Sequence, residues 1–311
     1  RTNYQRVGTA YDYGERLPRW GDRRITEFWR LAWRSMTQPG LERSLHPALI
    51  PPGVAHVHTV HSMMVCKGGV AAPQASKEGL LDLRRTVLTA GMWASLPFDY
   101  MVKVSGQTHV HAELIDRFPA PVDHKAWPLL LNRTLRLNCL TSDYSYLWES
   151  LYSPAFEFDR WTAPFAELAS TPQLDSEWSW GVPYRSDFDR RSALVEIDAL
   201  VAIMLGLTSD QLSEIFRSQF PVLRKYESEM YFDAEGSRIA RDHQVRGVVQ
   251  RKDDYRLLKE FEAGSDCEDL LERYKPFAPA GERSGPWFYR ADREAEMRAA
   301  YADFEQRLAS A

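Results

Sequence analysis

The sequence predicts an α+β fold, in which a mixed α/β module comes first and a mainly helical region follows. Up to about residue 65, short runs alternate between apolar and polar side chains, which is typical of strands with one buried face. From about residue 79, apolar residues recur every three or four positions, the spacing of an amphipathic helix. We expect an α+β domain over 1–152, an irregular connection over 153–186 and a helical region over 187–311.

The clearest strand is predicted in EFWRLAWRSM, residues 27–36. Alternation would place one set of side chains, Phe28, Arg30, Ala32 and Arg34, opposite a second set, Trp29, Leu31, Trp33 and Ser35. We therefore expect one face with arginines and one with aromatic and aliphatic side chains. A Pro-Pro-Gly break at 51–53 separates this run from another alternating one, and 66–77 are expected to form a loop.

Helices are predicted over 79–104 and 124–152, and again over much of the chain after residue 187. Gly106 should end the first of them. Thr208 and Gln211 stand in the positions of a capping box, which predicts that a helix begins there. Pro221 should stop that helix, and 287–309 should form a final charged one.

Composition places the chain among ordinary globular proteins. Of its 311 residues, 44% are hydrophobic and 26% are charged. No apolar run approaches the roughly 18 to 20 residues that a membrane-spanning helix needs, so we expect no membrane partner. The three cysteines are scattered and form no CxxC pair, which disfavours a disulfide framework and favours a cytoplasmic protein.

Charge is distributed unevenly along the chain. The net charge is −4, which by itself argues against nucleic acid, but residues 1–50 hold nine arginines and five acids, a balance of 9 − 5 = +4. The remainder therefore carries −8. Arginine accounts for 31 of the 39 basic residues, and its planar fork suits phosphate and guanine. A GC-rich genome produces the same arginine bias, so the bias alone decides nothing.

A histidine-rich segment, HVHTVHSMMVC, raises the hypothesis of a metal site. His56 and His58 would point the same way on a strand, His61 follows, and His109 and His111 form a second such pair. However, Val60 stands where binuclear hydrolases with a His-x-His-x-Asp-His motif have aspartate, and no nearby carboxylate offers a third ligand. We expect no metal here, and a metal-dependent hydrolase remains an alternative.

Motifs for nucleophilic or nucleotide chemistry are absent. The sequence has no GxSxG, no GxxxxGK[ST] and no GxGxxG. We therefore assign no catalytic and no cofactor-binding residue to this chain.

Four blocks of the sequence resemble one family when taken in order. They are ERSLHPALIPPGVAHVHTVHS, SLPFDYMVKVSGQTHVHAELIDRFPAP, LNRTLRLNCLTSDYSYLWE and VEIDALVAIMLGLTSDQLSEIF with its following FPVLRKYE. Together they resemble the C-terminal target-recognition region of type IIG-like adenine-specific DNA methylases of restriction-modification or phage-defence systems. The layout is similar to that of the TaqI-like specificity domain, and the resemblance spans nearly the whole chain.

The resemblance implies a DNA-binding part of such an enzyme that does not itself transfer the methyl group. The family's catalytic Asn/Asp-Pro-Pro-Tyr/Phe motif is absent, since the single Pro-Pro, Pro51-Pro52, lies between Ile50 and Gly53. We expect S-adenosylmethionine to bind an N-terminal methylase half before Arg1, or a companion subunit, and this chain to bind duplex DNA.

The expected DNA-binding residues fall in three places. An apolar helix at 91–102 should lead into a polar turn that carries Lys103, Gln107, His109 and His111. An arginine-rich loop surrounds Trp20, with Arg16, Arg19, Arg23 and Arg24, and Arg30 and Arg34 extend it along the first strand. Two alternatives stay open: both segments are ordinary solvated loops, or the tryptophan-rich segment 148–180 docks a protein partner.

Overall fold

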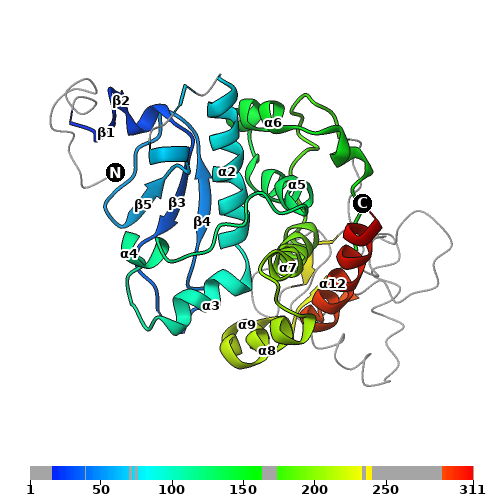
Figure 1. Ribbon diagram of the computed structural model, residues 1–311. Helices are drawn as coiled ribbons and strands as arrows, with labels where there is room; N and C mark the ends of the chain where they lie inside the picture. Colours follow the sequence, from blue (N-terminus) through cyan, green and yellow to red (C-terminus); the bar gives the residue numbers. More distant parts are fainter. Residues whose placement is uncertain are drawn as a thin grey trace, which may run out of the picture.

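A computed structural model describes residues 16–38, 40–69, 72–73, 76–162, 174–232, 236–239 and 289–310 of the chain. Over these residues the chain has an α+β fold, as the sequence predicts (Figure 1). Small antiparallel sheets lie at the N-terminal side, and a group of helices occupies most of the remainder.

The N-terminal sheet has three antiparallel strands in the order β4-β3-β5. Its strands are β3 (Arg30–Arg34), β4 (Pro47–Ile50) and β5 (Val60–Met63). Trp33 at the centre pairs with Pro47 on one side and His61 on the other. A short hairpin of β1 (Arg19–Trp20) and β2 (Arg23–Arg24) precedes the sheet and is followed by one 3-10 turn, η1 (Ile25–Glu27).

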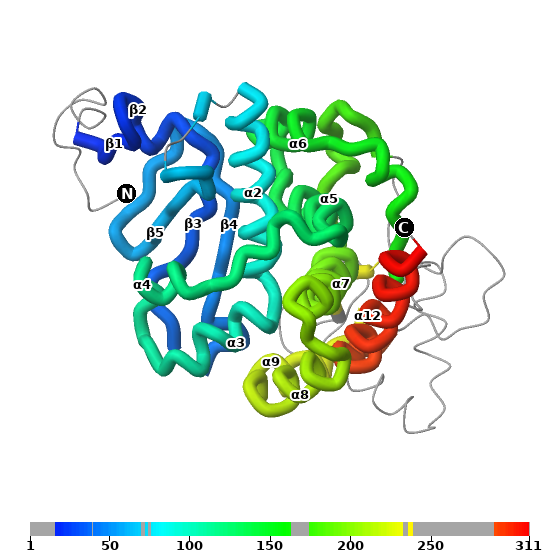
Figure 2. The backbone as a smooth tube through the Cα atoms, in the orientation of Figure 1, coloured from blue at the N-terminus to red at the C-terminus, as the bar shows by residue number. Residues whose placement is uncertain are grey.

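Helix α2 (Lys77–Trp93) packs against this sheet, and the backbone trace shows the helix running beside the strands (Figure 2). Ser76 caps its N-terminus, because the Gly79 N–H donates to the Ser76 hydroxyl at 3.0 Å. At its other end Trp93 meets Trp33 of β3 edge to face, with ring centroids 5.3 Å apart. This aromatic contact fixes the end of the helix against the middle strand.

The structure has two helices where the sequence predicts one over 79–104, so the prediction of a continuous helix was wrong. Helix α2 ends at Trp93, and α3 (Leu96–Val104) begins after the extended Ser95. Proline lacks an N–H and clashes with the preceding turn, so Pro97 is tolerated only in the first turn of a helix. The buried Asp198 accepts a hydrogen bond from the Leu96 N–H at 2.7 Å, which holds the start of α3.

The other helices surround this module on one side. They are α4 (Ala112–Ile115), α5 (Trp127–Asn138), α6 (Ser145–Leu151), α7 (Asp187–Met204), α8 (Ser209–Gln219), α9 (Pro221–Glu227) and α12 (Arg293–Ser310), with 3-10 turns η2 (Lys67–Gly69), η3 (Ser142–Tyr144) and η4 (Pro154–Phe158). Helices α7 and α12 lie side by side, although they are far apart in sequence (Figures 1 and 2). A second three-stranded sheet, in the order β7-β6-β8, joins β6 (Tyr231–Phe232), β7 (Arg238–Ile239) and β8 (Tyr289–Arg290).

Helix boundaries confirm two predictions and correct one. The capping box is present: the Gln211 N–H donates to Thr208 Oγ1, and the Gln211 side chain accepts from the Thr208 N–H. Pro221 does more than stop α8, because it also opens α9 as its first residue. The final helix begins at Arg293, and residues 289–290 form strand β8 before it.

One cluster of buried hydrophobic side chains runs through both halves of the chain. It includes Leu31 of β3, Trp148 of α6, Leu200 of α7 and Phe304 of α12. Sheet and helices therefore share a core, and α7 lies at its middle. No helix among the described residues is both long and apolar enough to cross a membrane.

Candidate nucleic-acid interface

The polar turn predicted to contact DNA follows α3 directly. The Ser105 hydroxyl donates to the Val102 carbonyl at 2.7 Å, and the Gln107 N–H donates to the same hydroxyl at 3.2 Å. Gly106 adopts φ +67°, a left-handed conformation that costs a side-chain-bearing residue energy. The glycine thus reverses the chain, and Gln107 emerges exposed at the tip.

The segment after the turn pairs with the end of β3. The Thr37 N–H donates to the Thr108 carbonyl at 2.9 Å, and the Val110 N–H donates to the Ser35 carbonyl at 2.7 Å. A bridge between Met36 and His109 lies between these bonds. Val110 itself is fully buried, so its neighbours His109 and His111 are held outward on a fixed backbone.

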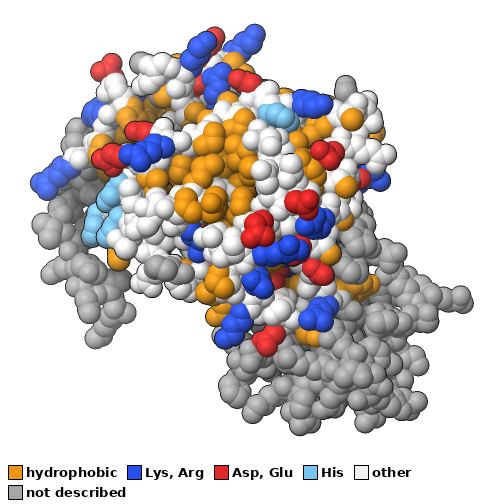
Figure 3. Space-filling view, turned by 60° about the horizontal axis from the view of Figure 1, so that its bottom comes forward, with side chains coloured by type: hydrophobic (Ala, Val, Ile, Leu, Met, Phe, Trp, Pro, Cys, Tyr) orange, Lys and Arg blue, Asp and Glu red, His pale blue; other side chains and the backbone are white. Residues whose placement is uncertain are grey.

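This pairing brings the two histidine-rich segments of the sequence together. The rings of His109 and His111 stack with centroids 5.5 Å apart, and His111 lies 5.8 Å from His61 of β5. His61 in turn stacks on Trp33 at 5.6 Å. Figure 3 shows histidine side chains gathered at one edge of the molecule. We call His61, His109 and His111 the histidine cluster.

Burial affects the protonation of His61, a member of the histidine cluster. Burial lowers the pKa of His61, and the neighbouring His111 and His56 lower it further. His61 is therefore neutral at pH 7, with one ring nitrogen as donor and the other as acceptor. Such a group suits the polar edge of a base more than it suits a phosphate.

The residues of the hypothetical metal site are divided between different contacts. His56 shares a 2.7 Å hydrogen bond with the Ser62 hydroxyl, His61 faces Trp33, and His58 is exposed. Among the described residues, no group of three or more histidine, cysteine, aspartate or glutamate side chains is placed to hold a metal ion. The hydrolase alternative gains no support from this geometry.

The arginine face predicted for the first strand is only half exposed, so the expectation for Arg30 is corrected. Arg30 is fully buried, and its guanidinium donates to the Phe28 and Val54 carbonyls and to the Ser62 hydroxyl. The loop after β4 covers this end of the face, and burial lowers the pKa of Arg30. Arg30 is therefore unavailable to DNA, whereas Arg34 at the other end is exposed.

The arginine-rich loop around Trp20 forms the β1–β2 hairpin. Its register places Arg19 opposite Arg24 on one face and Trp20 opposite Arg23 on the other. Trp20 and Arg23 both lie against the Phe28 ring, at 5.5 Å and 4.4 Å. The hairpin is thus anchored by its aromatic face, which leaves Arg19 and Arg16 exposed.

Part of the hairpin's charge is already balanced. Arg23 pairs with Glu27 at 3.1 Å, and the Arg24 N–H donates to the same carboxylate at 2.9 Å. The backbone hydrogen bond from Arg24 and the side-chain bond from Arg23 lower the pKa of Glu27. Arg19 donates to the Asp22 carbonyl, a neutral acceptor, at 2.8 Å.

The hairpin and the polar turn lie at opposite ends of β3 and on the same side of the molecule (Figure 1). Five strand residues rise by roughly 3.3 Å each, so β3 alone separates the two ends by about 13 Å. A duplex lying along the sheet edge would span such a distance within one helical turn, which is about 34 Å.

Lys103 points elsewhere than the histidine cluster. Its ammonium lies 5.1 Å from the ring centroid of Phe220, at the junction of α8 and α9. Together with Gln107 it lines a pocket that this junction closes. The predicted turn therefore presents two different surfaces, one with histidines and one with Lys103.

The tryptophan-rich segment belongs in part to the core. Trp148 is fully buried, and its indole N–H donates to the Asp175 carbonyl at 2.9 Å. Trp180 is 68% exposed and lies under the Arg185 guanidinium at 3.7 Å. Residues 163–173 of the segment lie outside the described residues, and the described ones show one exposed indole rather than a broad aromatic surface.

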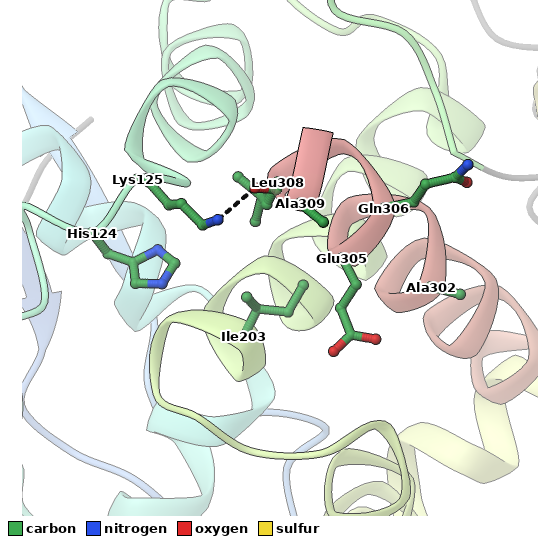
Figure 4. A pocket seen from close by; sticks show the side chains of 8 residues that line it. All are labelled: His124, Lys125, Ile203, Ala302, Glu305, Gln306, Leu308 and Ala309. Carbon is green, nitrogen blue, oxygen red and sulfur yellow. Dashed lines mark hydrogen bonds between the residues drawn. The ribbon is translucent and has the colours of Figure 1, made fainter. Parts of the chain in front are cut away.

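A second depression lies beside the C-terminal end of α12 (Figure 4). Lys125 donates to the Leu308 carbonyl at 2.5 Å, and burial and the charge of Lys125 lower the pKa of His124. A cation at a helix C-terminus stabilises the free carbonyls there, so Lys125 has a structural partner. We assign this depression no ligand.

No family model, curated protein or solved structure matches the chain. The geometry therefore stands on its own. Sequence reasoning did not predict the contact between His61 and the second histidine pair. It also did not identify Met36 and Thr37, whose backbone pairs with the segment after the turn. The signal that could have found them is the presence of two short runs, 60–63 and 107–110, that can pair with the strand at 30–34 and with the residues that follow it.

Proposed function

We propose that this chain is the DNA-binding target-recognition part of an adenine-specific DNA methyltransferase of a restriction-modification or phage-defence system. The proposal rests on the family resemblance of four ordered sequence blocks. It is supported by one structural observation: the segment 107–110 is fixed to the end of β3 and holds polar side chains outward beside the histidine cluster.

Rigid placement matters for sequence recognition. Base edges are discriminated by hydrogen bonds of defined geometry, whereas a flexible loop loses entropy on ordering. Gln107 offers the amide that suits adenine, and the imidazole rings of the histidine cluster offer further hydrogen-bonding groups. These side chains would form hydrogen bonds with base edges in a groove of the duplex.

Phosphate contacts would come from the arginines at both ends of the sheet. Arg34 is exposed beside the paired segment, and Arg19 of the hairpin and Arg16 just before it lie about one strand length away. Such contacts orient a protein on the duplex and carry no sequence information.

The chemistry would belong to another part of the enzyme. The sequence has no Asn/Asp-Pro-Pro-Tyr/Phe motif to hold a flipped adenine and no glycine-rich loop for the cofactor. S-adenosylmethionine would therefore bind the methylase half or a companion subunit. The chain alone should transfer no methyl group to DNA.

Binding of a fluorescent duplex to the purified chain tests this proposal. His109→Ala/His111→Ala should weaken binding roughly thirtyfold, because each of the two hydrogen bonds removed is worth about 1 kcal/mol. Both side chains are exposed, so stability should hardly change. His124→Ala, which changes a histidine beside α12, is the control and should bind as the wild type does. Equal affinities for all three proteins would refute the proposed reading surface.

A further inference from the structure

A pocket of about 310 Å³ lies where the polar turn meets the helical half of the chain. The end of α3, the turn at 106–108, the loop that starts at Thr37 and the α8–α9 junction all line it. Its volume lies near the lower end of the roughly 300–1,000 Å³ that small-molecule pockets occupy. It therefore has room for a sugar-sized ligand.

Most residues that line this pocket have polar side chains, and one of them is positively charged. Side-chain amides come from Gln38, Gln107 and Gln219, and hydroxyls come from the threonines and serines between them. Lys103 supplies the charge, and no described aspartate or glutamate lines the pocket. Such a lining offers many donors and favours a ligand with negatively charged oxygens.

Lys103 is available to a ligand. Its ammonium rests over the Phe220 ring, and among the described residues no carboxylate forms an ion pair with it. A cation over an aromatic face keeps most of its hydrogen-bonding capacity, because the ring uses none of its three protons as a conventional acceptor would. The lysine is thus held in position while its donors stay uncommitted.

Thr37 supplies a second, independent indication. The side chain is 7% exposed, and its hydroxyl has no hydrogen-bond partner among the described residues. A buried hydroxyl without a partner is unfavourable, and native proteins keep few of them. A ligand or an ordered water in the pocket that Thr37 lines would satisfy it.

We propose that this pocket binds a sugar phosphate, with the phosphate on Lys103 and Thr37 and the sugar hydroxyls on the surrounding amides. The site shares Gln107 with the DNA-binding surface proposed above, but it does not depend on DNA binding. The same chemistry has two sources, a free nucleotide or sugar phosphate and a nucleotide unit of a DNA strand.

Calorimetric titration of the full chain with deoxyadenosine 5′-monophosphate tests the site, with ribose as the control without phosphate. The nucleotide should bind saturably and ribose should not. Lys103→Met keeps the stem over Phe220 but removes the charge, and it should weaken binding about tenfold to hundredfold. Lys225→Met, an exposed lysine on α9 outside the pocket, should bind as the wild type does.

Thr37→Val separates binding from folding. It removes the unpartnered hydroxyl at nearly constant volume, so the chain should stay folded while binding weakens. Adding a duplex then identifies the source: competition with the nucleotide indicates a strand-derived phosphate, and simultaneous binding indicates a free ligand. No saturable binding of the nucleotide, or equal binding by wild type, Lys103→Met and Thr37→Val, would overturn the proposal.

Discussion

Arg30 and Arg34 occupy the same face of one strand and have opposite environments. The guanidinium of Arg30 is enclosed by three acceptors, and that of Arg34 faces solvent. Alternation in the sequence predicts which side chains share a face, but it carries no information about what covers that face. The cover here is the loop at Val54, which a local pattern around residue 30 cannot reveal.

Replacing each of these arginines by alanine should separate stability from binding. Arg30→Ala leaves buried acceptors without a donor, and it should lower the free energy of unfolding by about 1–3 kcal/mol. Arg34→Ala should leave stability unchanged within about 0.5 kcal/mol and should lower the salt dependence of DNA binding. Urea denaturation and binding titrations of both variants measure the two quantities. A salt dependence that falls in Arg30→Ala and not in Arg34→Ala would contradict the assigned orientation.

Helix α7 shows how far a single element can be predicted. The sequence predicts its apolar stripe, yet the structure also buries four charged residues on it, Asp189, Arg191, Glu196 and Asp198. Their partners come from other elements: Arg293 of α12 bonds Asp198 at 2.6 Å, and Glu227 of α9 bonds both Arg191 and Arg293. Periodicity within one helix cannot identify partners that lie tens of residues away.

These ion pairs hold the C-terminal helix on the core, which predicts a contrast within α12. Arg293→Ala removes one charged partner from each of two buried carboxylates, Asp198 and Glu227, and should lower the free energy of unfolding by about 3 kcal/mol. Arg298, on the same helix, pairs with the exposed Asp210 at 2.7 Å, and its removal should cost much less, because solvent screens an exposed ion pair. Urea denaturation of both variants gives the comparison. Similar losses in the two variants would mean that the buried network does not anchor the helix.

At the scale of the whole molecule, the sequence predicts the α+β class and the polar turn, and it does not predict how the parts join. The cluster of His61 with His109 and His111 depends on the pairing of segments nearly fifty residues apart. The shared core of sheet and helices likewise depends on contacts between segments that are distant in sequence. Such contacts arise from packing, which favours one arrangement among many that local patterns allow.

The buried network should also make the stability of the molecule depend on pH. Burial alone would raise the pKa of Glu227, but the charges of Arg293 and Arg191 outweigh it and lower that pKa below 4.5. A carboxyl whose pKa is lowered on folding stabilises the native state above its unfolded pKa, and that contribution disappears as pH falls through the folded pKa. Comparison of wild type with Glu227→Gln in denaturant at several pH values tests this. The stability difference should shrink below pH 4.5, and a constant difference would contradict the assignment.

The central claim, that this face binds duplex DNA, is tested most directly by the salt dependence of binding. The slope of log affinity against log salt should be steep for the wild type. In Arg16→Ala/Arg19→Ala/Arg23→Ala/Arg24→Ala it should fall by about 1 for each arginine that touches a phosphate in the wild type, while the preferred sequence stays the same. Gln107→Ala should do the reverse, with discrimination reduced by about 1–3 kcal/mol at an unchanged slope. A quadruple variant that keeps the wild-type slope, or a wild type that does not bind duplex DNA, would contradict the claim.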